Sequence, residues 1–459
     1  MSQIPAKVFR AYDVRGKVGP DIDARFAGLL GKAIGTAARR EGRTTLSVGR
    51  DCRTHSPELH AALVTGLRST GITVVDIGIV PTPLVYFSLF HLEREVQGGV
   101  MITGSHNAKE YNGFKICLGQ TSIHGERIQD LRCLIEADDF EEGQGGYRER
   151  PVLRDYIDTV KKGLWFPHTR IKVVVDCGNG TAGPVAIPLL TELGFDVIPM
   201  FAEMDGNFPN HHPDPTEPHN LEALQKRVLT VGAAVGVAYD GDADRIGLID
   251  ERGQVLFGDK ILILLARKLL EWEPGAAIVG EVKCSQTLFD DITARGGRAI
   301  MSQVGHSLIK ARMKEEGALL AGEMSGHIFF KHRYFGYDDA IYATCRVLEV
   351  LARDSRPLSA QLEDLPQTYS TPEIRLQCPD EKKFSVVASL QAQFKADPSV
   401  RAVIDIDGAR VVWGDGWGLV RASNTEPVLV VRCEAGSEAG LARIRQAIEG
   451  SVALTLARS

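Results

Sequence analysis

The stretch VGVAYDGDADRIGLIDE, residues 235–251, decides how the rest of the chain is interpreted. An apolar run that predicts a strand ends at Asp240, and Asp242 and Asp244 follow at alternate positions before Arg245. Three carboxylates on one tight loop repel one another unless a cation or a proton compensates, and oxygen ligands at this spacing suit Mg²⁺ or Ca²⁺. The stretch therefore predicts a divalent-cation loop between two strands. A plain Asp/Gly turn is the simpler alternative.

Two other kinds of protein also carry clustered aspartates. In an EF-hand, Glu251 would fall at the twelfth position counted from Asp240, but the sixth position should be Gly and is Arg245 here. Strands, rather than helices, are expected on both sides of the loop, which argues against an EF-hand. An enzyme that forms an aspartyl phosphate needs clustered carboxylates and Mg²⁺ as well, and spacing alone leaves that alternative open.

Length and composition limit the class of protein. A chain of 459 residues is too long for one ordinary core, so we expect three or four domains. The net charge of −6 gives no support to nucleic-acid binding over the whole surface. Eight cysteines without a CxxC pair are typical of reduced core residues. No signal peptide or membrane span is apparent, so we expect a cytoplasmic protein without membrane partners.

Three segments share one plan of strand, polar or Gly-rich turn, helix and strand. They begin with TLSVGRD (45–51), IKVVVDCGNGTAG (171–183) and AIVGEVKCSQ (277–286), and each predicts a βαβ unit. After residue 367 the pattern changes to short alternating strands with two helical stretches. These changes predict α/β domains at 1–150, 151–253 and 254–367, and a smaller α+β domain at 368–459.

Other loops carry reactive or charged groups. VMITGSHNAKEYNGFKIC (100–117) places Ser105 after a predicted strand, where an exposed serine can act as nucleophile or phosphate carrier, and Lys115 adds a cation. Lys283 and His306 each follow a predicted strand, where the ligand-facing loops of α/β sheets gather. His306 is a candidate for proton transfer. Ordinary turn, surface and core roles are the alternatives for each of these residues.

Two later loops suit a phosphosugar. GEMSGHIFF (322–330) contains Glu323, Ser325 and His327, which are suited to gripping vicinal hydroxyls. RASNTEP (421–427) packs Arg421, Ser423, Asn424 and Thr425 into one turn, where a guanidinium and neutral donors suit a phosphate dianion. Near the N-terminus, FRAYDVRG (9–16) places Arg15 beside a short turn. A plain polar turn would explain each loop equally well if it stood alone.

Together and in this order, these segments resemble the α-D-phosphohexomutase superfamily, most closely the bacterial phosphomannomutase/phosphoglucomutase group. TGSHN, DGDADR, GEMSGH and RASNTEP carry the resemblance, with support from FRAYDVRG, YNGFK and VGHS, and it covers the whole chain. The resemblance implies an α/β fold of four domains around a central cleft. Three domains would be related mixed-sheet units, and the C-terminal one would be a smaller α+β domain.

The resemblance also implies a reaction. Ser105 would carry a phosphoryl group, and Mg²⁺ would be held by Asp240, Asp242, Asp244 and a phosphoserine oxygen. Phosphate would move between C1 and C6 of a hexose through glucose or mannose 1,6-bisphosphate, while the metal and Arg245 stabilise the group in transit. The candidates for proton transfer are His306, Lys115 and Arg15. We expect an electrostatic role for Arg15, because a guanidinium stays protonated and is therefore a poor general base.

Substrate contacts follow from the same resemblance. Glu323, Ser325 and His327 would contact the sugar, and Lys283 would make further phosphate or sugar contacts. The phosphate that is not reacting would be held by Arg421, Ser423, Asn424 and Thr425. Met324 is the variant of the mannose/glucose group, whereas Gln there points to glucosamine phosphate. The serine loop departs from the family pattern, with Gly104 for Ala and Ala108 for Pro, which predicts a more flexible loop.

Other functions remain as alternatives to this mutase. They are a phosphoglucosamine mutase, an aspartyl-phosphate phosphatase using Asp240 or Asp242, and a non-catalytic protein that binds a sugar phosphate or Ca²⁺. The expected partners are small phosphosugars, with no nucleic acid, and the chain is expected to be a monomer.

Overall fold

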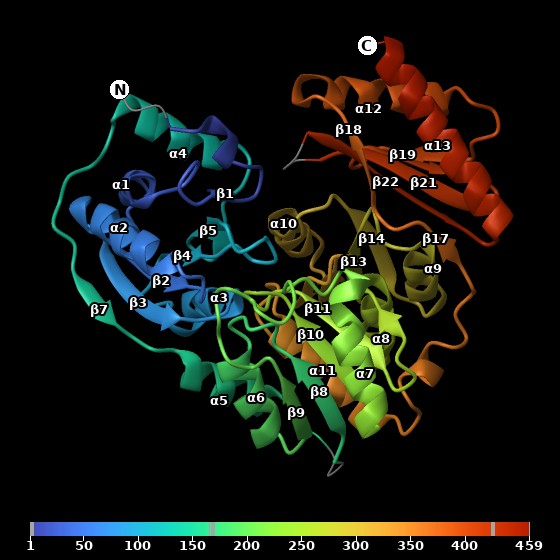
Figure 1. Ribbon diagram of the computed structural model, residues 1–459, viewed down its shortest axis with the longest axis horizontal. Helices are drawn as coiled ribbons and strands as arrows, with labels where there is room; N and C mark the ends of the chain where they lie inside the picture. Colours follow the sequence, from blue (N-terminus) through green and yellow to red (C-terminus); the bar gives the residue numbers. More distant parts are fainter. Residues whose placement is uncertain (1–3, 165, 167–169, 424–426, 459) are drawn as a thin grey trace.

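The computed structural model describes residues 4–164, 166, 170–423 and 427–458. Within these residues, four β-sheets each pack against helices. Figure 1 shows four units in chain order, with the first (blue) and the fourth (red) at opposite ends of the arrangement and the second and third between them. The expected α/β class, with three mixed sheets and a smaller C-terminal unit, is confirmed.

The first unit is a mixed sheet of order β1-β5-β4-β2-β3-β7, with β6 paired to β5. Its strands are β1 (Val14–Lys17), β2 (Thr45–Arg50), β3 (Thr73–Ile79), β4 (Gly98–Ile102), β5 (Tyr111–Leu118), β6 (Thr121–Ser122) and β7 (Tyr147–Glu149). The helices are α1 (Ala24–Arg40), α2 (Ser56–Ser69), α3 (Thr82–His91) and α4 (Glu126–Ala137), after the short 3₁₀ helix η1 (Ala6–Val8). Strands β2, β3 and β4 are parallel, so their carboxyl ends and the loops that follow them meet at one edge.

The second unit has the strand order β12-β11-β10-β8-β9. Its strands are β8 (Lys172–Asp176), β9 (Asp196–Met200), β10 (Val235–Tyr239), β11 (Ile246–Asp250) and β12 (Val255–Leu256), and its helices are α5 (Leu153–Gly163), α6 (Gly183–Glu192), η2 (Pro218–Leu221) and α7 (Glu222–Val231). The strands predicted before and after the aspartate loop are β10 and β11, which pair antiparallel. Strand β12 pairs antiparallel with β11 and lies at the edge of this sheet.

The third unit has the strand order β14-β13-β15-β16, and the fourth sheet is antiparallel throughout. The third contains α8 (Gly258–Trp272), β13 (Ala277–Glu281), α9 (Gln286–Ala294), β14 (Arg298–Ser302), α10 (His306–Glu316), β15 (Leu320–Gly322), β16 (Ile328–Phe330), α11 (Ala340–Arg353) and η3 (Ser359–Gln361). The fourth contains β17 (Tyr369–Ser370), β18 (Ile374–Gln377), α12 (Asp380–Lys395), β19 (Ala402–Ile404), β20 (Ala409–Val412), β21 (Gly416–Ala422), β22 (Val428–Ala435) and α13 (Glu438–Arg458).

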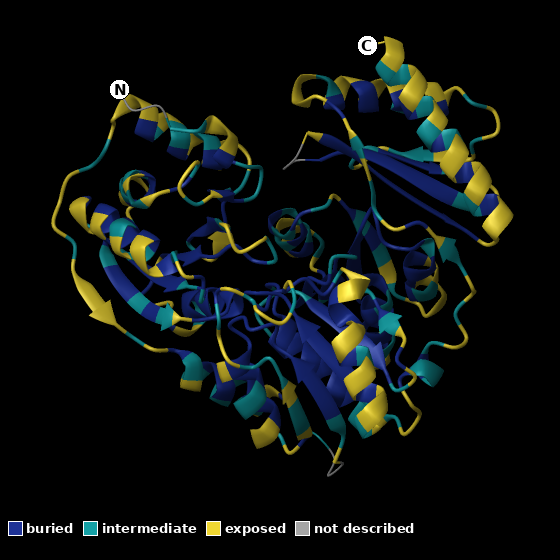
Figure 2. Ribbon diagram, in the orientation of Figure 1, coloured by how far each residue is buried: buried dark blue, intermediate teal, exposed yellow. Residues whose placement is uncertain are grey.

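One hydrophobic cluster runs through the first three units, whereas the fourth has a separate core. Figure 2 shows the second and third sheets as largely buried strands beneath exposed helix faces. Helix α3 connects the units: Leu84 and Tyr86 on it are buried in the same cluster as Val237 of β10 and Ile261 of α8. This shared core fixes the relative positions of the loops that leave β4, β10 and β15.

The fourth unit is attached to the third through arginines. Arg410 is fully buried and stacks on Trp417 with its guanidinium carbon 3.7 Å from the ring centroid. It donates to the carbonyls of Val282 and Cys284 at 2.5 and 2.8 Å, and Arg432 donates to the carbonyl of Lys283. The fourth unit therefore holds the loop on which Lys283 lies.

All eight cysteines are free, and six of them are buried, as expected for reduced core residues. Among the helices that the structure describes, none combines the length and the apolar character that a membrane crossing requires.

Candidate functional site

The three aspartates of the 240–245 loop lie together between β10 and β11. All three are fully buried, and their ligand oxygens lie within 4.8 Å of one another. Burial and the two neighbouring carboxylates raise the pKa of Asp240. Two of the buried oxygens, Asp242 Oδ1 and Asp244 Oδ1, have no hydrogen-bond partner among the described residues. Three carboxylates this close together, with two oxygens left without a partner, form a donor set that fits a hard divalent cation.

Ser105, in the loop between β4 and β5, contacts this aspartate loop directly. Its hydroxyl donates to Asp240 Oδ2 at 2.9 Å although the two residues are 135 positions apart. The close approach depends on Gly241, because a Cβ there would lie 2.7 Å from the Ser105 carbonyl oxygen. Ser105 is only 2% exposed, so the expectation of an exposed serine is wrong: the second unit covers it.

Lys115, on β5, contacts the same aspartates. Its ammonium lies 2.8 Å from Asp242 Oδ2 and also bonds Asp244. Burial alone would lower the pKa of Lys115, but the carboxylates of Asp242 and Asp244 outweigh it and raise that pKa above its ordinary value. The same contact, with a 2.5 Å bond from Thr82, holds the pKa of Asp242 below its ordinary value despite burial. Lys115 therefore compensates the charge of the aspartates and is not a solvent-exposed surface lysine.

Arg53 organises the serine loop, and sequence reasoning missed it. This buried guanidinium donates to the carbonyls of Ser105, Asn107, Ala108 and Tyr111 at 2.5–3.1 Å. Asp51 pairs with Arg53 at 3.2 Å and accepts from the Gly104 amide at 3.0 Å. The only signal in the sequence was an Asp and an Arg just after a predicted strand, a common pattern.

The surroundings of Gly104 explain why it replaces a larger residue. A Cβ at this position would lie 2.4 Å from Arg53 Nε, so only glycine leaves room for the guanidinium. The extra flexibility expected from Gly104 and Ala108 is offset because the loop's carbonyls are bound to Arg53.

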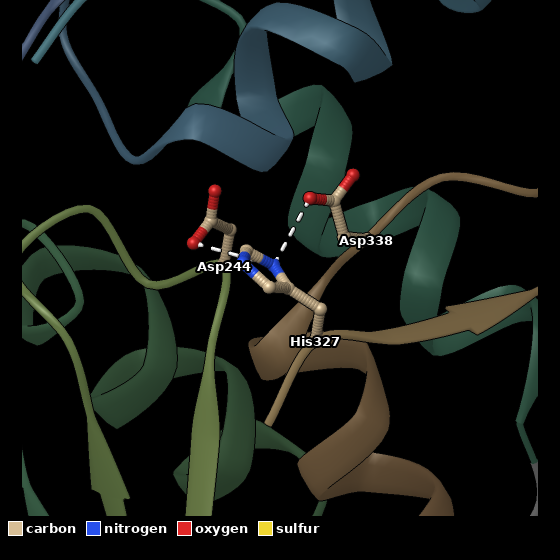
Figure 3. A group of neighbouring side chains, drawn as sticks. All are labelled: Asp244, His327 and Asp338. Atoms are coloured by element: carbon tan, nitrogen blue, oxygen red, sulfur yellow. Dashed lines mark ion pairs between the residues drawn. The ribbon is translucent and has the colours of Figure 1, made fainter. Parts of the chain in front are cut away.

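Arg245 and His327 join the second and third units. Arg245 Nε donates to His327 Nε2 at 3.0 Å, and the two residues form an isolated backbone bridge. On the other side of the ring, Nδ1 of His327 lies 3.1 Å from Asp338 Oδ2 and 3.6 Å from Asp244 Oδ1 (Figure 3). Asp338, which sequence reasoning also missed, is fully buried and accepts from Lys310 at 3.1 Å.

The other candidates for proton transfer lie nearby. His306 begins α10, and its ring stacks on that of His327 with 5.8 Å between centroids. Burial, and then the Lys310 ammonium, hold the pKa of His306 well below its ordinary value, so the ring is neutral. Arg15 donates to Asn107 Oδ1 and to Asp13, both at 2.5 Å, which places it beside the serine loop.

The residues expected to bind sugar and phosphate lie on the third and fourth units. Glu323 accepts from the Gly305 amide at 2.8 Å, beside His306, and Ser325 is half-buried. Lys283 pairs with Glu373 at 3.2 Å, and Arg421 pairs with Asp407 at 3.0 Å. Ser423 is buried, whereas Asn424 and Thr425 lie outside the described residues.

Asp407 connects two of these loops. Its Oδ2 accepts from Arg421 and also, at 3.0 Å, from the amide of Val304, two residues before His306. Tyr12 of the first unit donates to the Val304 carbonyl at 2.7 Å. The segment before His306 is therefore in contact with both the first and the fourth unit.

Comparison with known proteins covers nearly the whole chain. Four family models match: "Phosphoglucomutase/phosphomannomutase, alpha/beta/alpha domain I" at residues 6–142, domain II at 154–253, domain III at 257–369 and the C-terminal domain at 373–451. The chain is 45% identical over 442 residues to a phosphomannomutase/phosphoglucomutase of Pseudomonas aeruginosa, which covers 96% of this chain and 94% of that one.

Two further matches agree with these. A phosphoglucomutase of Neisseria gonorrhoeae is 42% identical over 453 residues, which is 97% of this chain and 96% of that protein. The crystal structure of a phosphoglucomutase/phosphomannomutase family protein from Burkholderia thailandensis superposes with a TM-score of 0.92 at 42% identity, and the match covers 99% of this chain and 98% of that one.

Replacing Arg53 with Lys should loosen the serine loop. The lysine has one nitrogen in place of the three of a guanidinium, so several of the four carbonyls would lose their donor, at about 1–3 kcal/mol for each buried group left unpaired. We expect faster hydrogen exchange in the peptide covering residues 100–117, measured by mass spectrometry. Arg43→Lys is the matched control, because Arg43 pairs only at the surface with Glu41 and Gln97. Unchanged exchange in Arg53→Lys would show that Arg53 does not hold the loop.

Proposed function

The chain belongs to the phosphoglucomutase/phosphomannomutase family and is an enzyme of that class, and from this premise we propose that it moves phosphate between C1 and C6 of mannose and glucose phosphates through phosphorylated Ser105. The observation that carries the proposal is the 2.9 Å contact between Ser105 Oγ and Asp240 Oδ2. It joins a hydroxyl that can carry phosphate to the one loop whose three carboxylates suit a divalent cation.

The arrangement of the aspartates favours Ser105 over an aspartyl phosphate. Asp240 Oδ1 accepts from the amides of Asp244 and Arg245 at 3.1 Å, and Asp242 Oδ2 accepts from Thr82 and Lys115. Both carboxylates are already engaged in these contacts, so we propose the Ser105 hydroxyl as the group that carries the phosphate. The EF-hand alternative is wrong, because strands β10 and β11 enter and leave the loop.

We propose Mg²⁺ as the cation, held by Asp240, Asp242, Asp244 and an oxygen of the phosphoserine. The support is the all-oxygen donor set and the two buried oxygens without partners. When bound, the cation supplies Lewis-acid stabilisation of charge on the phosphoryl oxygens.

The proposed transfer breaks one bond to phosphorus and forms another. The bond from phosphorus to Ser105 Oγ breaks, and a bond from phosphorus to the free sugar hydroxyl oxygen forms. The proton of that hydroxyl passes to a base, for which we propose the neutral ring of His306. The Ser105 oxygen takes one proton from solvent as it leaves, and His306 releases one to solvent, so the protons balance. Arg245 and Lys115 stabilise charge in transit, and Arg15 acts electrostatically. The product is glucose or mannose 1,6-bisphosphate, which turns over and returns its other phosphate to Ser105.

The sugar and its second phosphate would bind to the third and fourth units. We propose that Glu323, Ser325 and His327 contact the hydroxyls, and that the phosphate is held by Lys283, Arg421, Ser423, Asn424 and Thr425. Lys283 and Arg421 are buried, so an anion near them is poorly screened by solvent. We propose a cytoplasmic monomer that acts on small phosphosugars.

Phosphorylation of Ser105 is the first test. Mass spectrometry of the purified chain should find phosphate on the peptide that contains Ser105. Ser105→Ala should lower mutase turnover by at least about 1,000-fold, because the covalent step is lost. Ser389→Ala, on the exposed face of α12, is the control and should keep full activity. Turnover that survives Ser105→Ala at the wild-type rate would contradict the phosphoserine route.

Metal removal tests the proposed cation. Dialysis against EDTA should abolish turnover, and Mg²⁺ should restore it. Ca²⁺ should restore it poorly, because Ca²⁺ favours longer bonds and more ligands than three carboxylates and one phosphoryl oxygen provide. Full turnover in EDTA, or equal recovery with Ca²⁺, would count against Mg²⁺.

Substrate assays test specificity. Mannose 1-phosphate and glucose 1-phosphate should be converted at comparable rates, with glucosamine 1-phosphate much slower, since Met324 rather than Gln lies in the 322–327 loop. Coupled assays that detect each 6-phosphate separately would measure this. If glucosamine phosphate were the only good substrate, the phosphoglucosamine mutase alternative would replace the present proposal.

A further inference from the structure

We propose that Asp338 is a positioning residue: it fixes which nitrogen of His327 carries the proton, and His327 in turn orients Arg245 at the reaction centre. The role given to Arg245 rests on the proposed function. The arrangement Asp338, His327, Arg245 itself is a property of the structure and can be tested without an activity assay.

The contact with Arg245 determines the state of His327. A guanidinium is always protonated and can only donate, so Nε2 of His327 must accept the 3.0 Å bond from Arg245 Nε. Because Nε2 accepts this bond it carries no proton, and the proton of the ring must be on Nδ1. A proton on Nε2 would face the N–H of Arg245 directly.

Asp338 is the carboxylate that lies closest to this Nδ1 proton. Its Oδ2 lies 3.1 Å from Nδ1, compared with 3.6 Å for Asp244 Oδ1. The contact is close but bent, since neither Nδ1 nor Asp338 Oδ2 makes a hydrogen bond of good geometry with a described residue. The attraction is therefore mainly that of a buried carboxylate for the N–H dipole. Figure 3 shows the ring between the two carboxylates.

The other oxygen of Asp338 is held by Lys310. Its Oδ1 accepts from the Lys310 ammonium at 3.1 Å, and this cation packs 4.0 Å from the centroid of the buried Tyr86 ring. Lys310 therefore keeps the carboxylate oriented with Oδ2 toward His327. Asp338 Oδ2 also lies 3.6 Å from Nδ1 of His306, so one carboxylate faces both rings.

A second cation site is the competing explanation of this cluster. Asp244 Oδ1, His327 Nδ1 and Asp338 Oδ2 are all buried without a hydrogen-bond partner, and they lie within ligand distance of one another. A metal on Nδ1 would force the proton to Nε2, against the N–H of Arg245. Lys310, Lys115 and Arg245 already surround these carboxylates with positive charge. The hydrogen-bond pattern therefore favours the positioning role.

The substitution Asp338→Asn should move the proton of His327 from one ring nitrogen to the other. The Lys310 ammonium can only donate, so the amide oxygen would stay toward Lys310 and the amide NH₂ would face His327. Nδ1 would then have to accept, the proton would move to Nε2, and the bond from Arg245 would be lost. The same logic explains why an Asp-to-Asn change behind a catalytic histidine is so costly in serine proteases.

The first measurement uses the wild-type enzyme. Long-range ¹H–¹⁵N spectra of the full chain with ¹⁵N-labelled histidine distinguish a protonated from an unprotonated ring nitrogen, and loss of a signal in His327→Gln assigns the ring. We expect the proton on Nδ1 in the wild type and on Nε2 in Asp338→Asn. A wild-type ring with its proton on Nε2 would overturn the proposal, whatever the activity.

Kinetics give the second measurement. Asp338→Asn should lower kcat by about 100-fold, the upper end of the effect seen when a group that orients a metal-binding histidine is removed. KM should change less than about threefold. The matched control is Asp339→Asn, which makes the same change one residue along, where Tyr156 and Tyr334 donate to the carboxylate and His327 is not contacted. The control should keep the wild-type kcat and the Nδ1 tautomer.

The outcomes separate the hypotheses. A tautomer change with lost kcat supports the positioning role, and an unchanged kcat or equal losses in both variants would overturn it. If dialysis with Zn²⁺ or Mn²⁺ loads a second ion per chain that Asp338→Asn cannot hold, the cluster is a metal site and the proposal is wrong. Failure of the proposed function would appear instead as a wild-type enzyme without mutase turnover, which leaves the tautomer result unaffected.

Discussion

The burial of three carboxylates at one point is the constraint on which the site depends. Asp240, Asp242 and Asp244 lose their contact with water, and such charges are tolerated only when cations and donors surround them. The groups that compensate come from other parts of the chain: Thr82 and Lys115 from the first unit, and His327 beside them from the third. The site is therefore complete only when the three units are packed together.

The sequence predicts the parts of the site that are local. An apolar run followed by DGDADR was enough to place β10, the aspartate loop and β11, because strand patterning and charge repulsion act over neighbouring residues. The contact between Ser105 and Asp240 required the family resemblance, since nothing in the spacing of residues 135 apart predicts it. The error about Ser105 exposure has the same origin, because the covering group lies on another unit.

Arg53 and Asp338 show why the supporting residues were missed. Each satisfies partners far along the chain or across the site: Arg53 binds carbonyls more than 50 residues away, and Asp338 faces Lys310, 28 residues earlier. An Asp or Arg at a strand end is common in surface turns, so the residue type alone indicates little. Only burial separates these residues from solvated ones, and burial is a tertiary property.

The surroundings of the two candidate bases affect their pKa values in opposite directions, which composition could not predict. Burial disfavours the charged form of both groups, but Lys115 contacts Asp242 and Asp244, whereas His306 lies beside the Lys310 ammonium. The carboxylates beside Lys115 raise its pKa, so it keeps its proton, whereas burial and Lys310 lower the pKa of His306 and leave its ring neutral. A base must be unprotonated before it can act, so these surroundings favour His306 over Lys115 for proton transfer.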